Sequence, residues 1–238
     1  MNTMFALMLV VALGSTTVLA ADSVSKPLHL LGGNSLDSFY TWIRGLGRDN
    51  DPAGVFSIKD GILQIRPTQS GYLGTKQDYS DYRMVAEFKW GTNMWGQYKD
   101  KNRNSGIYIH AADKDATNVF VPKSLQVQIA EGATGDIELA GGKLMVPGVT
   151  PRNGWIFDRP GKQPFKNVTG FRGPNELEKP FGEWNTLEVV CEGTGVKVSV
   201  NGTVTLQGTN AAPSAGRILI EAGNAEIFFR RLDLLPLK

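Results

Sequence analysis

The chain has 238 residues and a net charge of +2, because 25 Lys and Arg residues slightly outnumber 23 Asp and Glu residues. Charges of both signs are interspersed, whereas a nucleic-acid-binding surface needs clustered Lys and Arg, so no nucleic-acid partner is expected. Glycine is abundant, with 28 residues, and no long amphipathic helical pattern occurs. We therefore expect one large all-β domain with a substantial core.

Residues 1–20 form an apolar segment that ends in small residues at Val18 and Ala20. This ending, just before Ala21, resembles a signal-peptidase site, although the segment lacks the Lys or Arg with which a signal peptide usually begins. The alternative is an uncleaved membrane anchor, but the apolar stretch is short for a spanning helix and no basic cluster follows it. We expect a signal peptide at residues 1–20, a single domain at residues 21–238, and no membrane insertion after cleavage.

The single cysteine, Cys191, cannot form an internal disulfide. It lies in the apolar run from Leu187 to Cys191, which predicts a buried and inert thiol. An exported protein without disulfides fits a bacterial envelope better than a eukaryotic secretory route. The expected location is therefore the periplasm or the outside of a bacterial cell.

Short alternating or apolar runs recur between turn signals along the rest of the chain, as expected for a sandwich or a barrel. The predicted strands are Gly54–Lys59, Ile62–Pro67, Tyr72–Thr75, Tyr82–Trp90, Ser105–His110, Leu125–Ala130, Thr186–Glu192, Gly195–Val200, Thr203–Gly208, Arg217–Ala222 and Ile227–Leu234. Asp60-Gly61 and Asn201-Gly202 predict hairpin turns, because these pairs adopt the positive φ that tight turns require. The Gly- and Pro-rich interval from Gly141 to Pro180 predicts a long loop over one face of the sheet, and such loops are often binding elements.

The predicted strand Leu125–Ala130 is the most informative segment. Apolar residues at positions 125, 127 and 129 alternate with Gln126 and Gln128, so one face is expected to be buried and the other polar. A row of amides on a rigid sheet suits a hydroxyl-rich ligand such as a sugar, although an ordinary solvated sheet face has the same pattern. Glu131 and Asp136 follow at the end of this strand, in a glycine-rich turn.

Several blocks, in order along nearly the whole mature chain, resemble one known family. These blocks are Phe39–Trp42, Asp51–Phe56, Asp60–Gly61, Tyr79–Tyr82, Glu87–Gly91, Ser105–His110, Gln128–Asp136, Gly182–Thr186, Val200–Gly202 and Ala225–Arg230. Each block is weak alone, but together they resemble the 3-keto-disaccharide hydrolase domain family, formerly a domain of unknown function. The resemblance implies a jelly-roll β-sandwich of the concanavalin A-like lectin and glucanase type, with two antiparallel sheets. It also implies an exported, carbohydrate-active protein whose partner is a glycoside.

The chain departs from the family at one position. The family usually has Ser-Ile-Glu-x-Gln where this chain has Ser-Leu-Gln-Val-Gln at residues 124–128. The spacing of Gln126, Gln128 and Glu131 matches the Glu-x-Asp-x-x-Glu strand of retaining glucanases of this fold. Double displacement there needs two carboxylates about 5 Å apart, and an amide can neither form a glycosyl ester nor carry a proton at neutral pH. We argue against an ordinary retaining glucanase, while Gln126 can still bind a sugar hydroxyl.

A 3-keto sugar, the substrate class that the resemblance implies, changes the chemical requirement. The ketone at C3 acidifies the proton on C2, and the leaving group on C1 then departs by elimination, after which water can add. One base suffices, together with an electrophile that stabilises the enolate. Glu131 is the first candidate acid or base. A divalent cation could polarise the ketone.

His110 is the candidate partner of Glu131. If the isoleucines of the predicted strand Ser105–His110 face the core, Tyr108 and His110 face the polar surface that carries the two glutamines. His110 would then be a base or a cation ligand tuned near neutral pH. The alternative is a structural, hydrogen-bonded histidine.

Further residues complete the predicted site, each with an ordinary structural alternative. Asp136 either binds substrate or caps the glycine turn through backbone N–H groups, and Arg103 either holds a hydroxyl or carboxylate of the substrate or lies in a solvated loop. Trp155 lies in a predicted loop and is expected to stack on a sugar face as a wall of the cleft. Glu221 ends a late strand, where a role on the sheet face is the simpler account.

No cofactor is assigned from the sequence. Calcium is compatible with this fold, but no Asp-rich calcium loop is visible, so the metal is left open. Asp158 or Glu176, from another loop, could replace the missing family carboxylate.

Three functions compete at this level. The first is an exported enzyme that cleaves 3-keto-glycosides, as the retained Glu131, Gln128, His110 and Asp136 favour. The second is a non-catalytic, lectin-like protein that has lost a catalytic carboxylate at Gln126. The third is a structural envelope protein.

Overall fold

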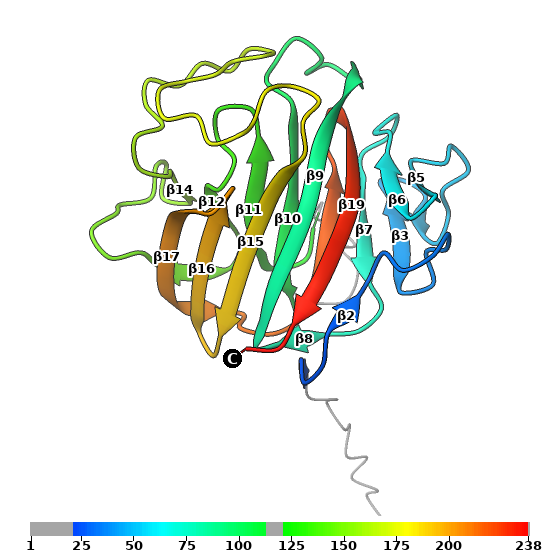
Figure 1. Cartoon of the computed structure of the whole chain (residues 1–238), viewed down its shortest axis with the longest axis horizontal. Coiled ribbons are helices and arrows are strands. Elements are labelled where there is room, and N and C mark those ends of the chain that lie inside the picture. Colours follow the sequence, from blue (N-terminus) through cyan, green and yellow to red (C-terminus); the bar gives the residue numbers. More distant parts are fainter. Residues whose placement is uncertain (1–20, 113–120, 238) are drawn as a thin grey trace, which may run out of the picture.

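The computed structural model describes residues 21–112 and 121–237, so the predicted signal peptide at residues 1–20 lies outside the described residues. Those residues form strands and connections, with no helix among them. The described residues therefore contain no helix that could span a membrane. Two large sheets pack face to face (Figure 1), which confirms the predicted all-β jelly-roll sandwich.

The first sheet has eight strands, all in antiparallel pairs. Its order is β14 (Ile156–Phe157), β12 (Ile137–Ala140), β11 (Ser124–Ala130), β10 (Asn104–Ala111), β18 (Arg217–Ala222), β7 (Gly71–Thr75), β3 (Phe39–Ile43) and β4 (Gly47–Arg48). Strands distant in the sequence thus become neighbours, and β18 lies between β10 and β7.

The second sheet has nine strands and is also antiparallel. Its order is β13 (Lys143–Met145), β17 (Thr203–Ala212), β16 (Gly195–Val200), β15 (Asn185–Glu192), β9 (Tyr82–Met94), β19 (Ala225–Leu235), β6 (Ile62–Ile65) and β5 (Phe56–Lys59), with β2 (Leu28–His29) paired to β19. A separate parallel pair joins β1 (Asp22–Ser23) to β8 (Tyr79–Ser80).

The eleven predicted strands are all present, most of them one or more residues longer than predicted. The sequence prediction missed β3, β12 and the strands of two or three residues, which leave too little alternation to detect. Both predicted hairpin turns are confirmed: Asp60 and Gly61 have φ of 52° and 71°, and Asn201 and Gly202 have φ of 48° and 84°.

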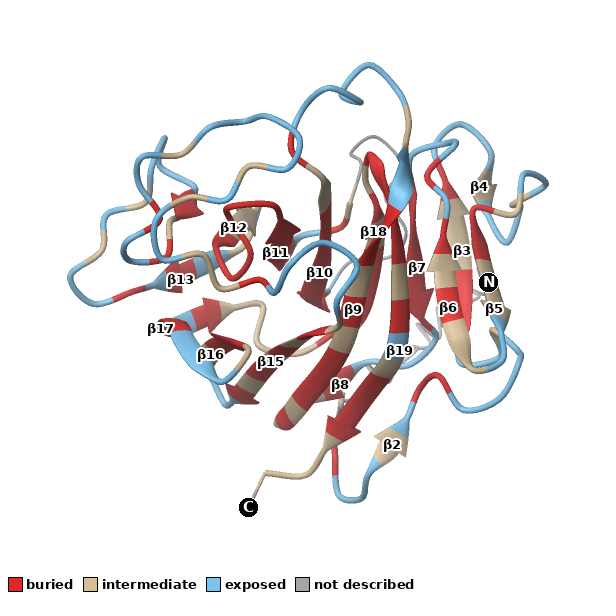
Figure 2. Ribbon diagram, turned by 45° about the horizontal axis from the view of Figure 1, so that its top comes forward, coloured by how far each residue is buried: buried red, intermediate tan, exposed pale blue. Residues whose placement is uncertain are grey.

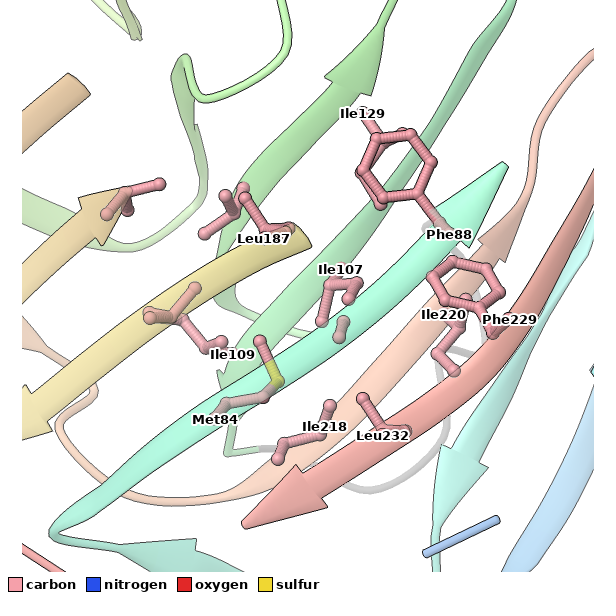
Figure 3. Packing of buried hydrophobic residues seen from close by; sticks show 14 of the residues in the cluster. Met84, Phe88, Ile107, Ile109, Ile129, Leu187, Ile218, Ile220, Phe229 and Leu232 are labelled. Atoms are coloured by element: carbon pink, nitrogen blue, oxygen red, sulfur yellow. The ribbon is translucent and has the colours of Figure 1, made fainter. Parts of the chain in front are cut away.

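The core lies between the two large sheets, and burial alternates along the long strands β9 and β19 (Figure 2). Figure 3 shows isoleucines of the eight-stranded sheet packed against Met84, Phe88 and Phe229 of the other sheet. The Phe88 and Phe229 rings lie 6.3 Å apart. Each such buried side chain contributes about 1.5–3 kcal/mol through removal of apolar surface from water.

Cys191 is buried in this core. Burial raises the pKa of its thiol to about 12, which keeps the group protonated at neutral pH. The prediction of an inert thiol is therefore confirmed.

The outer face of the eight-stranded sheet carries a second apolar cluster of Tyr40, Tyr72, Tyr108, Ala111 and Leu219. Trp42 stacks on Tyr72, with ring centroids 5.2 Å apart and planes 7° apart. This face was expected to be polar, but only its β11 side is rich in amides; its other half is aromatic. Aromatic rings beside amides are the usual surroundings of a sugar in a binding site.

The interval from Gly141 to Pro180 is largely a loop, as predicted, and contains only the short strands β13 and β14. It lies at one end of the sandwich, beside β11 and β12 (Figure 1). Its position brings Arg152, Lys162 and Phe165 against the outer face of the eight-stranded sheet.

Candidate functional site

Antiparallel register places polar side chains of four strands next to one another on the outer face of the eight-stranded sheet. Glu138 of β12 lies opposite Gln126 of β11, Gln126 lies opposite Tyr108 of β10, and Tyr108 lies opposite Leu219 of β18. Residues two apart on a strand share a face, so Glu221 of β18 lies on the same outer face as Leu219. The site therefore depends on strand pairing between residues almost a hundred positions apart.

Glu221 is the central carboxylate of this surface. Gln126 Nε2 donates a hydrogen bond of 2.7 Å to Glu221 Oε2. The pKa of Glu221 is raised to about 7, first by burial and then by the nearby Glu138, against the lowering effect of hydrogen bonds from Gln126 and Tyr108. A carboxyl group with this pKa can give or take a proton near neutral pH.

A glycine makes the contact between Gln126 and Glu221 possible. A Cβ built at Gly106, on the intervening strand β10, would collide with the Gln126 amide and lie 3.0 Å from its Cδ. Gly106 therefore leaves the channel through which the Gln126 side chain crosses β10 to reach β18. Any larger residue at this position would displace the amide from Glu221.

Gln128 continues the row of amides. Its Nε2 donates a long hydrogen bond of 3.4 Å to Gln126 Oε1, which turns the amino group of Gln126 toward Glu221. Hydrogen bonding from Gln128 also lowers the pKa of Glu138, whose overall rise is caused first by burial. Gln128 Oε1 is buried and has no hydrogen-bond partner among the described residues, so it is an acceptor suited to a ligand hydroxyl.

Two cavities meet at Glu221. The smaller, of about 350 Å³, holds Tyr108, Gln126, Gln128, Glu138 and Glu221 together with loop residues Arg152 and Lys162. The larger, of about 590 Å³, is lined by residues that follow β9 and by the turn after β18. Asn102, Asn104 and Glu221 line both cavities, so the carboxylate lies at their junction.

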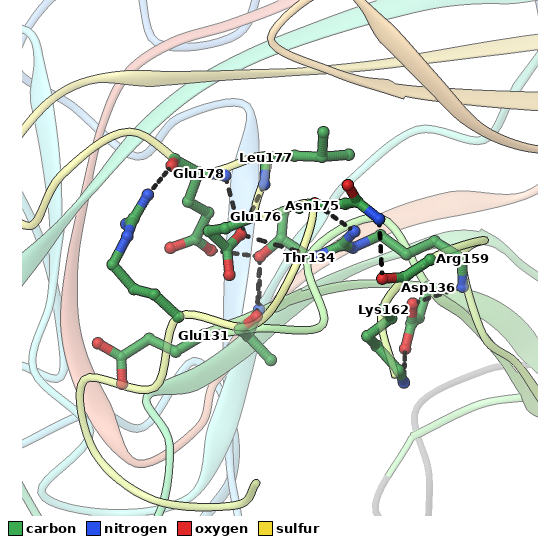
Figure 4. Close-up of polar contacts among 12 residues, drawn as sticks. Glu131, Thr134, Asp136, Arg159, Lys162, Asn175, Glu176, Leu177 and Glu178 are labelled. Atoms are coloured by element: carbon green, nitrogen blue, oxygen red, sulfur yellow. Dashed lines mark hydrogen bonds and ion pairs between the residues drawn. The ribbon is translucent and has the colours of Figure 1, made fainter. Parts of the chain in front are cut away.

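A buried charge cluster holds the long loop against the smaller cavity (Figure 4). Lys162 is only 1% exposed; its Nζ lies 2.5 Å from Asp136 Oδ2 and also contacts Asp158. Asp158 in turn accepts hydrogen bonds of 2.8 and 3.0 Å from Arg152. Burial raises the pKa of Asp136 to about 6, although Lys162 opposes the rise. The cluster thus brings two cations, Arg152 and Lys162, and the Asp136 carboxylate to the wall of the cavity.

The family model for 3-keto-alpha-glucoside-1,2-lyase-like domains matches residues 27–235. The chain belongs to this family. Comparison with curated protein sequences finds none that matches it.

Solved structures similar to this 3-keto-alpha-glucoside-1,2-lyase-like domain are glycosidase-type jelly rolls. Two candidate glycosyl hydrolases from Parabacteroides distasonis have TM-scores of 0.54 and 0.58 and identities of 20% and 14%; the matches cover 89% and 90% of this chain and 100% and 94% of theirs. The catalytic domain of LamA from Zobellia galactanivorans has a TM-score of 0.52 at 8% identity, with coverage of 86% and 94%. At these identities the likeness shows the fold alone, a glycosyl hydrolase-like or carbohydrate-binding jelly roll.

In this lyase-like domain Glu131 lies outside both cavities. It is buried; its Oε1 lies 2.6 Å from Arg103 Nη1, and its Oε2 accepts hydrogen bonds from the backbone N–H groups of Arg103 and Gly170. These contacts connect the residue before β10 to the long loop. Arg103 was predicted to bind substrate; in the structure it pairs with Glu131 and lines neither cavity.

His110 is not on the polar surface, so that prediction of its position is wrong. A bulge between Tyr108 and Ala111 gives His110 a φ of 57° and turns its ring into the core, where it packs edge-on against Tyr82 at 5.7 Å. Neither ring nitrogen makes a well-formed hydrogen bond within the described residues. Burial lowers the pKa of His110 to about 4, against a smaller opposing effect of the Pro213 carbonyl, so the ring is neutral at pH 7.

The other predicted site residues divide between the cavity and the surface. Tyr108, Gln126, Gln128 and Asp136 line the smaller cavity together, as predicted. Asp136 does not cap the glycine turn; its Oδ1 accepts the backbone N–H of Arg159 at 2.8 Å. Trp155 is 44% exposed and lines neither cavity described here.

Neither alternative carboxylate proposed from the sequence lies beside Gln126. Asp158 is occupied by Arg152 and Lys162, and Glu176 accepts the N–H groups of Leu177 and Glu178. The carboxylates that do accompany Gln126 are Glu221 and Glu138. The alternation within β18 placed Glu221 on a sheet face, but no signal in the sequence indicated which strands flank it.

A further buried carboxylate, Glu178, was not predicted. It accepts hydrogen bonds from the Thr134 hydroxyl and, at 3.0 Å, from Trp90 Nε1, and burial raises its pKa to about 7. These contacts anchor the long loop to the turn that follows β11. Among the residues that the structure describes, no three His, Cys, Asp or Glu side chains gather closely enough to hold a metal ion.

The buried pair of Arg103 and Glu131 makes a testable prediction about stability. Arg103→Met is expected to lower the free energy of unfolding by about 3–5 kcal/mol, because it leaves the Glu131 carboxylate buried without its cation. The Arg103→Met/Glu131→Gln double variant should lose less than the sum of the two single losses. Urea denaturation followed by fluorescence measures these differences.

The matched control is Arg83→Met. Arg83 pairs with Glu188 at 2.5 Å, but its side chain is 43% exposed, so its loss should cost less than about 1 kcal/mol. A similarly small cost for Arg103→Met would contradict the structural role assigned to the buried pair.

Proposed function

We propose that this domain is an enzyme that cleaves the glycosidic bond of 3-keto-glycosides by elimination, followed by addition of water. The observation that carries the proposal is the Glu221 carboxyl group, which lies at the junction of two cavities with a pKa of about 7. Membership in the 3-keto-alpha-glucoside-1,2-lyase-like family supports the substrate class.

Elimination suits this site better than double displacement. A retaining glycosidase needs a carboxylate nucleophile beside its acid/base residue, and an amide, Gln126, occupies the position of the family carboxylate on β11. A 3-keto sugar needs no enzyme nucleophile, because its C2 proton is acidic. One base in the right place is sufficient.

In the proposed reaction Glu221 removes the C2 proton of the keto sugar. The electron pair of the C2–H bond forms a C2=C3 double bond, and the ketone oxygen becomes an enolate. The enolate then re-forms the ketone as the C1–O bond breaks, with the new double bond between C1 and C2. The departing oxygen takes a proton, and later addition of water to C1 and C2 completes the hydrolysis.

The surroundings of Glu221 supply the other functions that this reaction needs. Arg152 and Lys162 bring positive charge to the smaller cavity, where it would stabilise the developing enolate. Glu138 is the second carboxyl group, and its raised pKa suits the delivery of a proton to the departing oxygen. The free acceptor Gln128 Oε1 would hold a sugar hydroxyl in place.

The proposal is tested by incubating the protein with 3-keto-trehalose and with unoxidised trehalose, each with and without a chelator. Free sugar is expected from the keto substrate alone. Glu221→Gln should lower kcat/KM by about 100- to 10,000-fold, the range for loss of a positioned base. Sensitivity to the chelator would add a catalytic metal.

Glu188→Gln is the matched control, because Glu188 lies on the opposite sheet and lines neither cavity. Full activity of Glu221→Gln would refute the assignment of the base. Sugar binding by the wild-type protein without any cleavage of keto or ordinary glycosides would instead favour a lectin-like protein.

The pKa of Glu221 predicts the pH dependence of the reaction. A base must be deprotonated, so the limb of kcat/KM that rises with pH should report Glu221 and have its midpoint near pH 7. Gln126→Leu removes a hydrogen bond that lowers this pKa, so it should move the rise to higher pH. Gln126→Glu should move it in the same direction, because it adds a like charge. Initial rates between pH 5 and 9 measure the shift; a rise near pH 4 that neither variant moves would contradict it.

We also propose that the enzyme acts outside the cytoplasm of a bacterium after removal of residues 1–20. The apolar leader and its small residues support this proposal. When the whole chain is expressed in a bacterial host, protein recovered from the periplasm is expected to begin at Ala21. An intact mass that still includes residues 1–20 would contradict the cleavage.

A further inference from the structure

We infer that the larger cavity binds the departing sugar, with Trp95 and Tyr98 as its aromatic wall and Asn104 as the hydrogen-bonding group at the point of cleavage. This inference rests on the proposed function and adds to it the place of the second ring. A substrate would then lie across Glu221, with its keto ring in the smaller cavity and its departing ring in the larger one.

The larger cavity is built as a rigid site by one asparagine. Asn224, in the turn after β18, donates from Nδ2 to the backbone oxygens of Tyr98 and Asn102 at 3.0 and 3.1 Å. Its Oδ1 accepts the N–H of Asn104 at 2.7 Å, and its backbone oxygen accepts the N–H of Trp95 at 2.8 Å. Asn224 is itself buried. It therefore holds the segment after β9 in position before a ligand arrives, which reduces the entropy lost on binding.

Two aromatic side chains face this cavity from that segment. Tyr98 is 57% exposed, and Trp95 is half-buried. Trp95 makes no side-chain hydrogen bond within the described residues, so its indole N–H is available to a hydroxyl. An exposed aromatic face beside polar donors is the arrangement that suits a pyranose ring.

Asn104 connects the two cavities. Asn104 lines both of them, as Glu221 does; its backbone bonds to Asn224, whereas its side-chain amide makes no hydrogen bond to a described residue. A donor in this place can reach the glycosidic oxygen or a hydroxyl next to it. The bond to be broken would therefore lie between Asn104 and the base.

The test compares two substrates that differ only in the departing group, 3-keto-trehalose and methyl 3-keto-α-D-glucopyranoside. Trp95→Ala is expected to lower kcat/KM about 10-fold or more for the disaccharide, because it removes aromatic contact with the second ring. For the methyl glycoside the change should be within about 2-fold. Tyr98→Ala should act in the same direction, and because Tyr98 is exposed its loss leaves the core intact.

Trp184→Ala is the matched control. Trp184 lies on the outer face of the other sheet, with Lys89 and Arg230 against its ring, and its loss should affect neither substrate. Equal losses on both substrates in Trp95→Ala and Tyr98→Ala, or no loss on either, would overturn the inference.

Calorimetric titration with trehalose separates this inference from the proposed function, because it needs no catalysis. Trehalose binding that is weakened by Trp95→Ala and kept by Trp184→Ala would support the sugar site even if no keto-glycoside is cleaved. Trehalose binding that is unchanged in Trp95→Ala would count against the site even if the enzyme is active.

Discussion

The hydrogen bond from Gln126 to Glu221 is the contact on which the candidate site depends. It joins β11 to β18 across β10, and it exists because Gly106 leaves room for the amide. The Glu221 side chain is half-buried, and the loss of water around it disfavours the charged form unless donors compensate. Hydrogen bonds from Gln126 and Tyr108 lower its pKa, which as a result is about 7. A glutamate side chain, ordinarily fully ionised at neutral pH, can then exchange a proton there. The Gln126 amide on β11 therefore lowers the pKa of the carboxyl group that we propose as the base.

Buried charges give the site its walls and explain the form of the long loop. The loop from Gly141 to Pro180 has almost no backbone pairing with the sheets, so side chains must hold it. Lys162 bonds to Asp136, Glu131 bonds to Gly170, and Glu178 bonds to Thr134. Each contact takes charged groups out of water and stabilises the fold only while both partners are present. A loop held in this way keeps Arg152 and Lys162 beside the smaller cavity without the support of regular secondary structure.

The predicted face of a residue was right where alternation alone decides it, and wrong where the chain departs from alternation. Tyr108, Gln126 and Gln128 lie together because they follow the period of two along regular strands. His110 follows the same pattern in the sequence, yet a bulge reverses its side, and no local signal distinguishes a bulge from a continuous strand. Glu131 was selected for its spacing from Gln126, but the turn places it against Arg103. Asp136 lines the cavity, where it pairs with Lys162 of the long loop. This contact exists only in the folded protein.

The sequence by itself determined the fold class, most of the strands, the hairpin turns and the identity of the amides on β11, because these depend on local periodicity and on turn residues. It also determined the family, through short blocks spread along the chain. Only the tertiary structure decided which carboxylate lies beside these amides and accepts their hydrogen bond. Glu221 is 95 residues from Gln126, and strand order across a sheet is set by the packing of the whole sandwich, which no local pattern encodes. The pKa of that carboxylate was decided in the same way, because burial is a property of the assembled sheets and loop.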